Sequence, residues 1–310
     1  RGDGIAAEVR LKEAQANGAA REDLAALMGE AMLAQGSLRK ARDWLEPGEF
    51  SADTAALGFR NLGRLERIEG HLDAAATAYD AALKLAPRDA MLWVDIARMR
   101  YAAGQHLLAI AAADRALALG ADHPRALELK GQIVRDQFGM AAALPWFERG
   151  LQVVPADLSL LGEYAATLGD AGRARAMLAV TRKMLDIDPG NPRAYFLQAV
   201  LAARAGKYDV ARALMYRTKG KLDEMPAAML LQGAVELATG NPDVAATVLD
   251  RLVRRQPANA RARVLLARAL DVAGEHKYLI DRFGAAAGRL DATPYFLTLV
   301  ARAHEAIGQR

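Results

Sequence analysis

The chain has 310 residues, of which 53% are hydrophobic but only 6% aromatic, so strand-forming residues are sparse and the composition favours an all-α fold. Its formal charge of +4 is spread along the chain and does not by itself indicate a nucleic-acid partner. Cysteine is absent, which excludes disulfides, a cysteine–zinc site and a thiol nucleophile. No apolar run has the roughly 18 residues that a membrane span needs.

Glycine recurs every 34 residues along the chain. The series is Gly2, Gly36, Gly70, Gly104, Gly172, Gly206, Gly240, Gly274 and Gly308. The only break is Phe138, where glycine comes one place later, at Gly139. Seven residues before each later position of the series, the residue is always glycine or alanine. Glycine ends a helix readily, and small residues let two antiparallel helices cross closely, so this period predicts stacked helix–turn–helix units.

Small residues at unit positions 8, 20 and 27, glycine at 15 and proline at 32 make these units resemble the tetratricopeptide repeat. The resemblance implies one right-handed superhelical solenoid over residues 1–310, with about eight units and a half unit at each end. In chain order we expect a half unit over 2–21, full units over 22–55, 56–89, 90–123, 124–157, 158–191, 192–225, 226–259 and 260–293, and a half unit over 294–310.

Motifs for catalysis are missing from the sequence. None of the five histidines has a histidine or carboxylate partner at the spacing of a helical metal site. The glycine-rich stretches do not match a phosphate-binding loop, and no nucleophile elbow or paired acid and base is found. We therefore expect no enzyme activity, no cofactor and no metal.

Partner-binding residues follow from the resemblance, in which positions 2, 5, 9 and 12 of each first helix face a concave groove. The candidates for a basic groove, with Asn61 at the neighbouring position 6, are Arg60, Asn61, Arg64, Arg67, Arg98, Tyr101, Gln132 and Arg135. The candidates for an apolar groove are Phe196, Val200, Leu230 and Leu237. Arginine forks suit carboxylates, so the basic groove predicts acidic side chains or a C-terminal tail as ligand.

The alternative interpretation of these arginines is that they lie in solvent or pair with neighbouring Glu and Asp. The carboxylate clamp of the resembled family uses lysine at position 5 and asparagine at position 9. Here those positions hold Arg60 and Arg64, so the clamp's specificity for chaperone tails is not expected.

The leading functional hypothesis is a non-catalytic scaffold that binds a peptide or protein partner. The alternative is the recruiting arm of a larger bacterial envelope, secretion, polysaccharide-export or glycosyltransferase protein, because the chain starts "RGDG" at a turn glycine, without methionine. RNA binding is disfavoured because the groove has few aromatics. An exposed half unit could stack on a second copy to give an end-to-end homodimer. Both the bacterial cytoplasm and the periplasm or cell envelope remain open as compartments.

Overall fold

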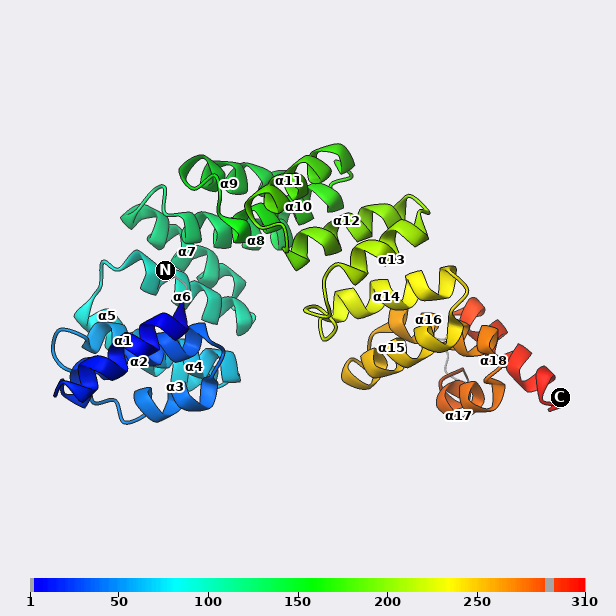
Figure 1. Ribbon diagram of the computed structural model, residues 1–310, viewed down its shortest axis with the longest axis horizontal. Coiled ribbons are helices and arrows are strands. Elements are labelled where there is room, and N and C mark those ends of the chain that lie inside the picture. The colour runs from blue at the N-terminus through cyan, green and yellow to red at the C-terminus, as the bar shows by residue number, and fades with distance from the viewer. Residues whose placement is uncertain (1–2, 288–292, 310) are drawn as a thin grey trace. The chain divides into compact units, whose positions relative to one another are not determined.

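The computed structural model describes residues 3–287 and 293–309, and all regular elements within these ranges are helices, with no strand among them (Figure 1). The predicted all-α fold of paired helices is confirmed. The helices are α1 (Gly4–Ala16), α2 (Arg21–Ala34), α3 (Leu38–Leu45), α4 (Ala55–Glu69), α5 (Leu72–Leu85), α6 (Ala90–Ala102), α7 (His106–Leu119), α8 (Pro124–Phe138), α9 (Met140–Val153), α10 (Leu158–Asp170), α11 (Ala174–Ile187), α12 (Pro192–Arg204), α13 (Tyr208–Tyr216), α14 (Pro226–Ala238), α15 (Pro242–Arg255), α16 (Ala260–Ala273), α17 (His276–Ala287) and α18 (Pro294–Ala306).

The helices belong to two compact units that divide between Thr167 and Leu168, near the end of α10. In the N-terminal unit α4 packs on α5, α6 on α7 and α8 on α9, and the first helices α4, α6 and α8 also contact each other in sequence. In the C-terminal unit α12 packs on α13 and α14 on α15, and α16 contacts both α17 and α18. Within each unit, these helices therefore bury their apolar sides against their own pair and against the neighbouring pair.

The turn inside a pair is made where the 34-residue series places its glycine. Gly70 follows α4 with a φ of 88°, in the left-handed region that other residues rarely adopt. At the break in the series, Phe138 is the last residue of α8 and Gly139 takes the positive φ of 90° instead. The turn has moved by one residue, and the glycine requirement has moved with it.

The small residues seven places earlier lie where paired helices cross. A Cβ on Gly63 would meet the Tyr79 ring at 2.5 Å, and one on Gly131 would meet the Phe147 ring at 2.6 Å. Tyr79 and Phe147 are themselves fully buried, so the large side chain of one helix occupies the space that glycine leaves on the other.

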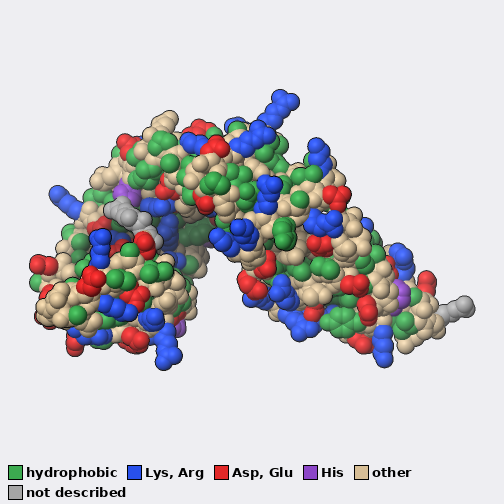
Figure 2. Space-filling model, in the orientation of Figure 1, with side chains coloured by type: hydrophobic (Ala, Val, Ile, Leu, Met, Phe, Trp, Pro, Cys, Tyr) green, Lys and Arg blue, Asp and Glu red, His purple; other side chains and the backbone are tan. Residues whose placement is uncertain are grey.

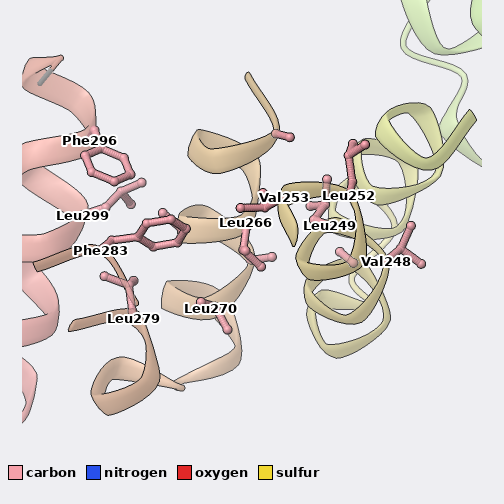
Figure 3. Close-up of a cluster of buried hydrophobic side chains, with 14 of the residues drawn as sticks. Val248, Leu249, Leu252, Val253, Leu266, Leu270, Leu279, Phe283, Phe296 and Leu299 are labelled. Atoms are coloured by element: carbon pink, nitrogen blue, oxygen red, sulfur yellow. The ribbon is translucent and has the colours of Figure 1, made fainter. Parts of the chain in front are cut away.

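An extended apolar core of the C-terminal unit runs from α14 to α18 (Figure 3). Phe283 of α17 and Phe296 of α18 meet edge to face, with ring centroids 5.4 Å apart, and Leu299 lies beside them. Leu266 and Leu270 of α16 join this pair to the α15 side chains, and Met229 of α14 belongs to the same cluster, so five helices share one core.

The surface carries both signs of charge, and Figure 2 shows Lys and Arg interspersed with Asp and Glu over the visible face of each unit. Among the described residues no helix combines the length and the apolar character needed to cross a membrane. The second helix of a pair is short in two repeats: α3 has 8 residues and α13 has 9. The second helices α5, α7, α9, α11 and α15 each have 14 residues.

Candidate functional site

The predicted basic residues come from three neighbouring first helices of the N-terminal unit. Arg60, Arg64 and Arg67 follow each other at helical spacing on α4, so they share one side of that helix. Arg98 and Tyr101 lie on α6, and Gln132 and Arg135 on α8. We call these seven residues the first-helix face; all are half-buried.

Arg60 is already paired with two carboxylates, one at the end of its own repeat and one in the next. Its guanidinium lies 3.3 Å from Asp89, which precedes α6, and 3.2 Å from Asp95, which lies on α6. The Asp95 side chain is only 3% exposed. Asp89 also accepts a hydrogen bond of 2.8 Å from the Met91 amide and so caps α6. Arg60 therefore joins α4 to α6.

Tyr101 and Arg135 also bridge repeats. The Tyr101 hydroxyl donates to the Asp136 carboxylate on α8, and this hydrogen bond raises the pKa of Tyr101 to about 12. Arg135 donates to Glu163 at 2.9 Å and to Thr167 at 3.2 Å, both on α10. Tyr101, Arg135 and Arg60 therefore fit the alternative interpretation, in which these side chains pair with neighbouring Asp and Glu residues.

Arg64, Arg67 and Arg98 differ, since none of them forms an ion pair within residues 3–287 and 293–309. Arg64 donates to the side-chain oxygen of Asn61 at 3.0 Å. Arg64 and Arg98 occupy the same position in consecutive repeats, on helices that contact each other. These three half-buried guanidinium groups thus remain without an ion pair on this face.

Asn61 is not available on the surface, contrary to its place among the expected groove residues. Its side chain is fully buried and donates to the Ala26 carbonyl at 3.1 Å, which joins α4 to α2. An asparagine at position 6 points between the helices rather than along the stripe of positions 2, 5, 9 and 12. Asn61 acts here by orienting Arg64.

The apolar candidates belong to the C-terminal unit and are half-buried. Phe196 and Val200 lie on α12, and Leu230 and Leu237 on α14. The two leucines pack against the core of α14 to α18, so part of their apolar surface is already used for folding.

The sequence-based prediction did not include the carboxylates that pair with arginines of the first-helix face. Asp95 and Glu163 accept ion pairs from the arginines of the preceding repeat. Both stand on the 34-residue series that starts at Asn61, with Leu129 between them. A polar residue at a position that is apolar in other repeats was the signal that could have identified them.

A second charged cluster joins α3 to α4. The ligand atoms of Glu66, Glu69 and His71 lie within 4.8 Å of one another, a spacing that could hold a metal ion. Arg42 lies 2.9 Å from Glu66 and also pairs with Glu69, so its positive charge already faces both carboxylates. His71 contacts Glu66 at 2.8 Å across the glycine turn, a pairing five residues apart that the helical metal-site spacings do not include. This arrangement is a repeat-to-repeat ion-pair network.

Comparison with known proteins agrees with the helical pairing. The tetratricopeptide repeat family matches residues 60–124, 94–157, 159–225 and 230–277, more than half of the chain. A search of curated proteins found no match. A tetratricopeptide repeat protein from Parabacteroides merdae has a TM-score of 0.60 and 18% identity, covering 78% of this chain and 96% of that one.

Two further solved structures share the fold. For Pseudomonas aeruginosa PilF the TM-score is 0.56 at 19% identity, over 70% of this chain and 99% of that one. For a chain of the APC/C hetero-tetramer Cut9–Hcn1 it is 0.66 at 15% identity, over 87% of this chain and 53% of that one. From its family match and its paired helices, this chain belongs to the tetratricopeptide repeat family.

Proposed function

We propose that the chain is a non-catalytic scaffold whose first-helix face binds an acidic segment of a peptide or protein partner, such as a C-terminal tail. Repeats of this family generally serve as protein-interaction scaffolds and are typically non-catalytic. The observation that carries the proposal is the pair Arg64 and Arg98, which are half-buried, lie on contacting helices and lack ion pairs within the described ranges.

A partner carboxylate would supply what these two arginines lack. A half-buried guanidinium has lost part of its water, so a carboxylate that binds through both oxygens recovers charge-assisted hydrogen bonds. Arg60 and Arg135 have their carboxylates inside the protein and would gain less. We therefore assign binding to Arg64 and Arg98 and a supporting role to Arg60 and Arg135.

The apolar residues are a second, weaker part of the proposal. Phe196 and Val200 of α12 are half-buried, and their remaining exposed apolar surface would hold an apolar side chain of the partner. Leu230 and Leu237 support the core, so their truncation would change folding and binding together. Phe196→Ser is the more informative variant for this part.

The test is charge reversal at the two unpaired arginines, Arg64→Glu with Arg98→Glu. The matched control is Arg88→Glu with Arg115→Glu, because both of these arginines are exposed in the same unit and neither forms a described ion pair. Binding of a fluorescently labelled Glu-rich peptide is measured by anisotropy at low salt, where charge interactions are least screened. Circular dichroism and thermal unfolding report on the fold.

We expect the variant with Arg64→Glu and Arg98→Glu, here called the groove variant, to lose peptide binding. Its helical signal and its melting temperature should stay those of the parent. The control carries the same change in net charge and should bind nearly as well as the parent. Equal losses in both variants would show that binding follows net charge alone. Unchanged binding in the groove variant would remove the first-helix face as the site.

A further inference from the structure

The unpaired arginines surround one buried polar centre between α4 and α6. Arg60, Arg64 and Arg67 project from one side of α4, and Asp95 and Arg98 are one turn apart on the contacting helix α6. The Arg60 Nε lies 3.2 Å from the Asp95 carboxylate. Burial raises the pKa of Asp95, and the charges of Arg60, Arg64, Arg98 and Arg67 oppose that rise, as expected where the arginine sides of the contacting helices α4 and α6 meet.

Polar atoms at this centre are buried without hydrogen-bond partners. The Tyr79 side chain is 1% exposed, and its hydroxyl has no partner among the described residues. The same holds for the Nε of Arg67. Burial and the Asp95 charge raise the pKa of Tyr79, and the contacts with Arg67 and Arg64 lower it, so its hydroxyl lies close to this charged centre and to Arg67 in particular. A buried hydroxyl and a buried guanidinium nitrogen are therefore left with hydrogen bonds to donate.

The charge of the centre favours a doubly negative ligand. Four guanidinium groups face two carboxylates, Asp95 and Asp89, and this leaves a net charge of +2. A phosphate monoester carries about −1.5 to −2 charges and three acceptor oxygens, whereas a carboxylate carries one charge and two oxygens. Three arginines without ion pairs match three oxygens better than two.

We propose that Arg64, Arg67 and Arg98 form a subsite for a phosphate monoester on the side chain of a bound peptide. The inference rests on the proposed function, because it names the chemistry of the acidic group that the first-helix face takes. Asp95 anchors Arg60 from inside and orients the cluster, but its own charge opposes the ligand. The subsite therefore combines a positioning carboxylate with three binding guanidinium groups.

The experiment compares four probes on the full chain. They are a blocked Gly/Ala peptide with a central phosphoserine, the same peptide with glutamate, the same peptide with serine, and inorganic phosphate alone. Calorimetric titration at low salt is applied to the parent, to Arg64→Gln with Arg98→Gln, and to Arg67→Gln. The control is Arg88→Gln with Arg115→Gln. Glutamine removes the charge and keeps an amide donor, and none of the changed arginines loses an ion pair.

We expect the phosphoserine peptide to bind at least about tenfold more tightly than the glutamate peptide, the effect of one further charge-assisted hydrogen bond. Both groove variants should lower its affinity to that of the serine peptide, and the control should match the parent. Asp95→Asn should tighten binding of the phosphoserine peptide by several fold, because it removes a negative charge from the centre.

Other results separate this inference from the proposed function. Equal affinity for the glutamate and phosphoserine peptides, lost in the groove variants, would overturn the phosphate subsite and leave the acidic-partner scaffold standing. Inorganic phosphate that binds as tightly as the phosphoserine peptide would overturn the peptide as its source. Failure of every peptide to bind, with Glu-rich peptide binding unaffected by Arg64→Glu and Arg98→Glu, would overturn both.

Discussion

The sharpest test of the repeat packing is Gly131→Ala, in the middle of α8. The new Cβ would lie 2.6 Å from Cε1 and 2.7 Å from Cζ of Phe147, which is fully buried on α9. Ordinary carbon contacts are about 3.5–4.0 Å, so the two helices must separate by roughly 1 Å or the ring must leave its rotamer. Close-packed cores resist both changes.

The magnitude follows from two opposing effects. Alanine is a better helix former than glycine by about 1 kcal/mol, which stabilises the variant. Overpacking costs about 1–3 kcal/mol, and the upper end applies because the clashing group is a rigid, fully buried ring. We therefore expect Gly131→Ala to lower the free energy of unfolding by about 1–2 kcal/mol.

A matched control isolates the clash. Gly284 lies inside α17. A Cβ added there would have Cγ2 of Ile280 as its nearest neighbour, at 3.6 Å, which is an ordinary contact. Gly284→Ala should therefore stabilise the chain by up to about 1 kcal/mol. The assay is urea denaturation followed by far-ultraviolet circular dichroism and by tryptophan fluorescence, for which Trp146 beside Phe147 is a local reporter.

A second variant tests the cause. Phe147→Leu removes the ring atoms that meet the new Cβ, so the double variant with Gly131→Ala should lose less stability than the two single losses summed. Two results would refute the reasoning: a Gly131→Ala chain as stable as the parent, or strict additivity with Phe147→Leu.

Three further predictions concern buried polar contacts. Arg42→Gln should lower stability by about 1–3 kcal/mol at neutral pH, because it leaves the carboxylate of Glu66 poorly paired. Burial alone would raise the pKa of Glu66, but hydrogen bonds from Arg42 and a neighbouring histidine lower it overall. The stabilisation is thus present above the ordinary glutamate pKa and lost as the pH falls through the lowered one, so denaturation of parent and variant should converge in acid. Asp136→Asn should bring the pKa of Tyr101 from about 12 toward its ordinary value of 10.0, as ultraviolet titration would show; an unchanged value would contradict the hydrogen bond as its cause. Tyr79→Phe should leave stability unchanged or raise it by about 1 kcal/mol in the same urea assay, since it removes a buried hydroxyl without a partner, and a clear loss would show that the hydroxyl is bonded.

The paired-helix fold could be predicted because each position of the period has a geometric requirement of its own. A turn such as Gly70 needs a left-handed backbone, and a crossing such as Gly63 against Tyr79 needs the absence of a Cβ. These requirements recur at a fixed interval, so many weak local signals agree with one another.

The 34-residue period did not predict local departures from the pattern, such as the early end of one second helix. Helix α13 ends at Tyr216, and the following segment forms turns in which Lys219 and Gly220 have φ of 52° and 73°. Gly220 was the local signal for this early end, because glycine inside a second helix weakens it. The regular spacing of neighbouring units concealed it.

The state of each candidate arginine could not be predicted from its own repeat, because its partner lies in the next one. Arg60 pairs with Asp95, 35 residues later, and Arg135 with Glu163, 28 residues later. Whether a carboxylate at such a distance reaches the guanidinium depends on how the helices stack. From the sequence, each arginine could either form an ion pair or remain available to a ligand. In the structure, Arg60 and Arg135 form ion pairs, whereas Arg64 and Arg98 form none among the described residues.

That division has a physical cause in the repeat itself. A first-helix residue meets its neighbour's residue about 34 positions away, so its charge partner is decided by what stands there. In the C-terminal unit, Arg204 meets Asp170, 34 residues earlier, and binds it at 3.0 Å. Arg64 meets Arg98 at this interval in the next repeat, and Arg98 meets Gln132. Glu30 stands 34 residues before Arg64, but the two form no ion pair among the described residues. Like charges in neighbouring repeats repel each other. An anion that binds between Arg64 and Arg98 therefore relieves this repulsion as well as pairing with each arginine, and its affinity should exceed that for one arginine alone.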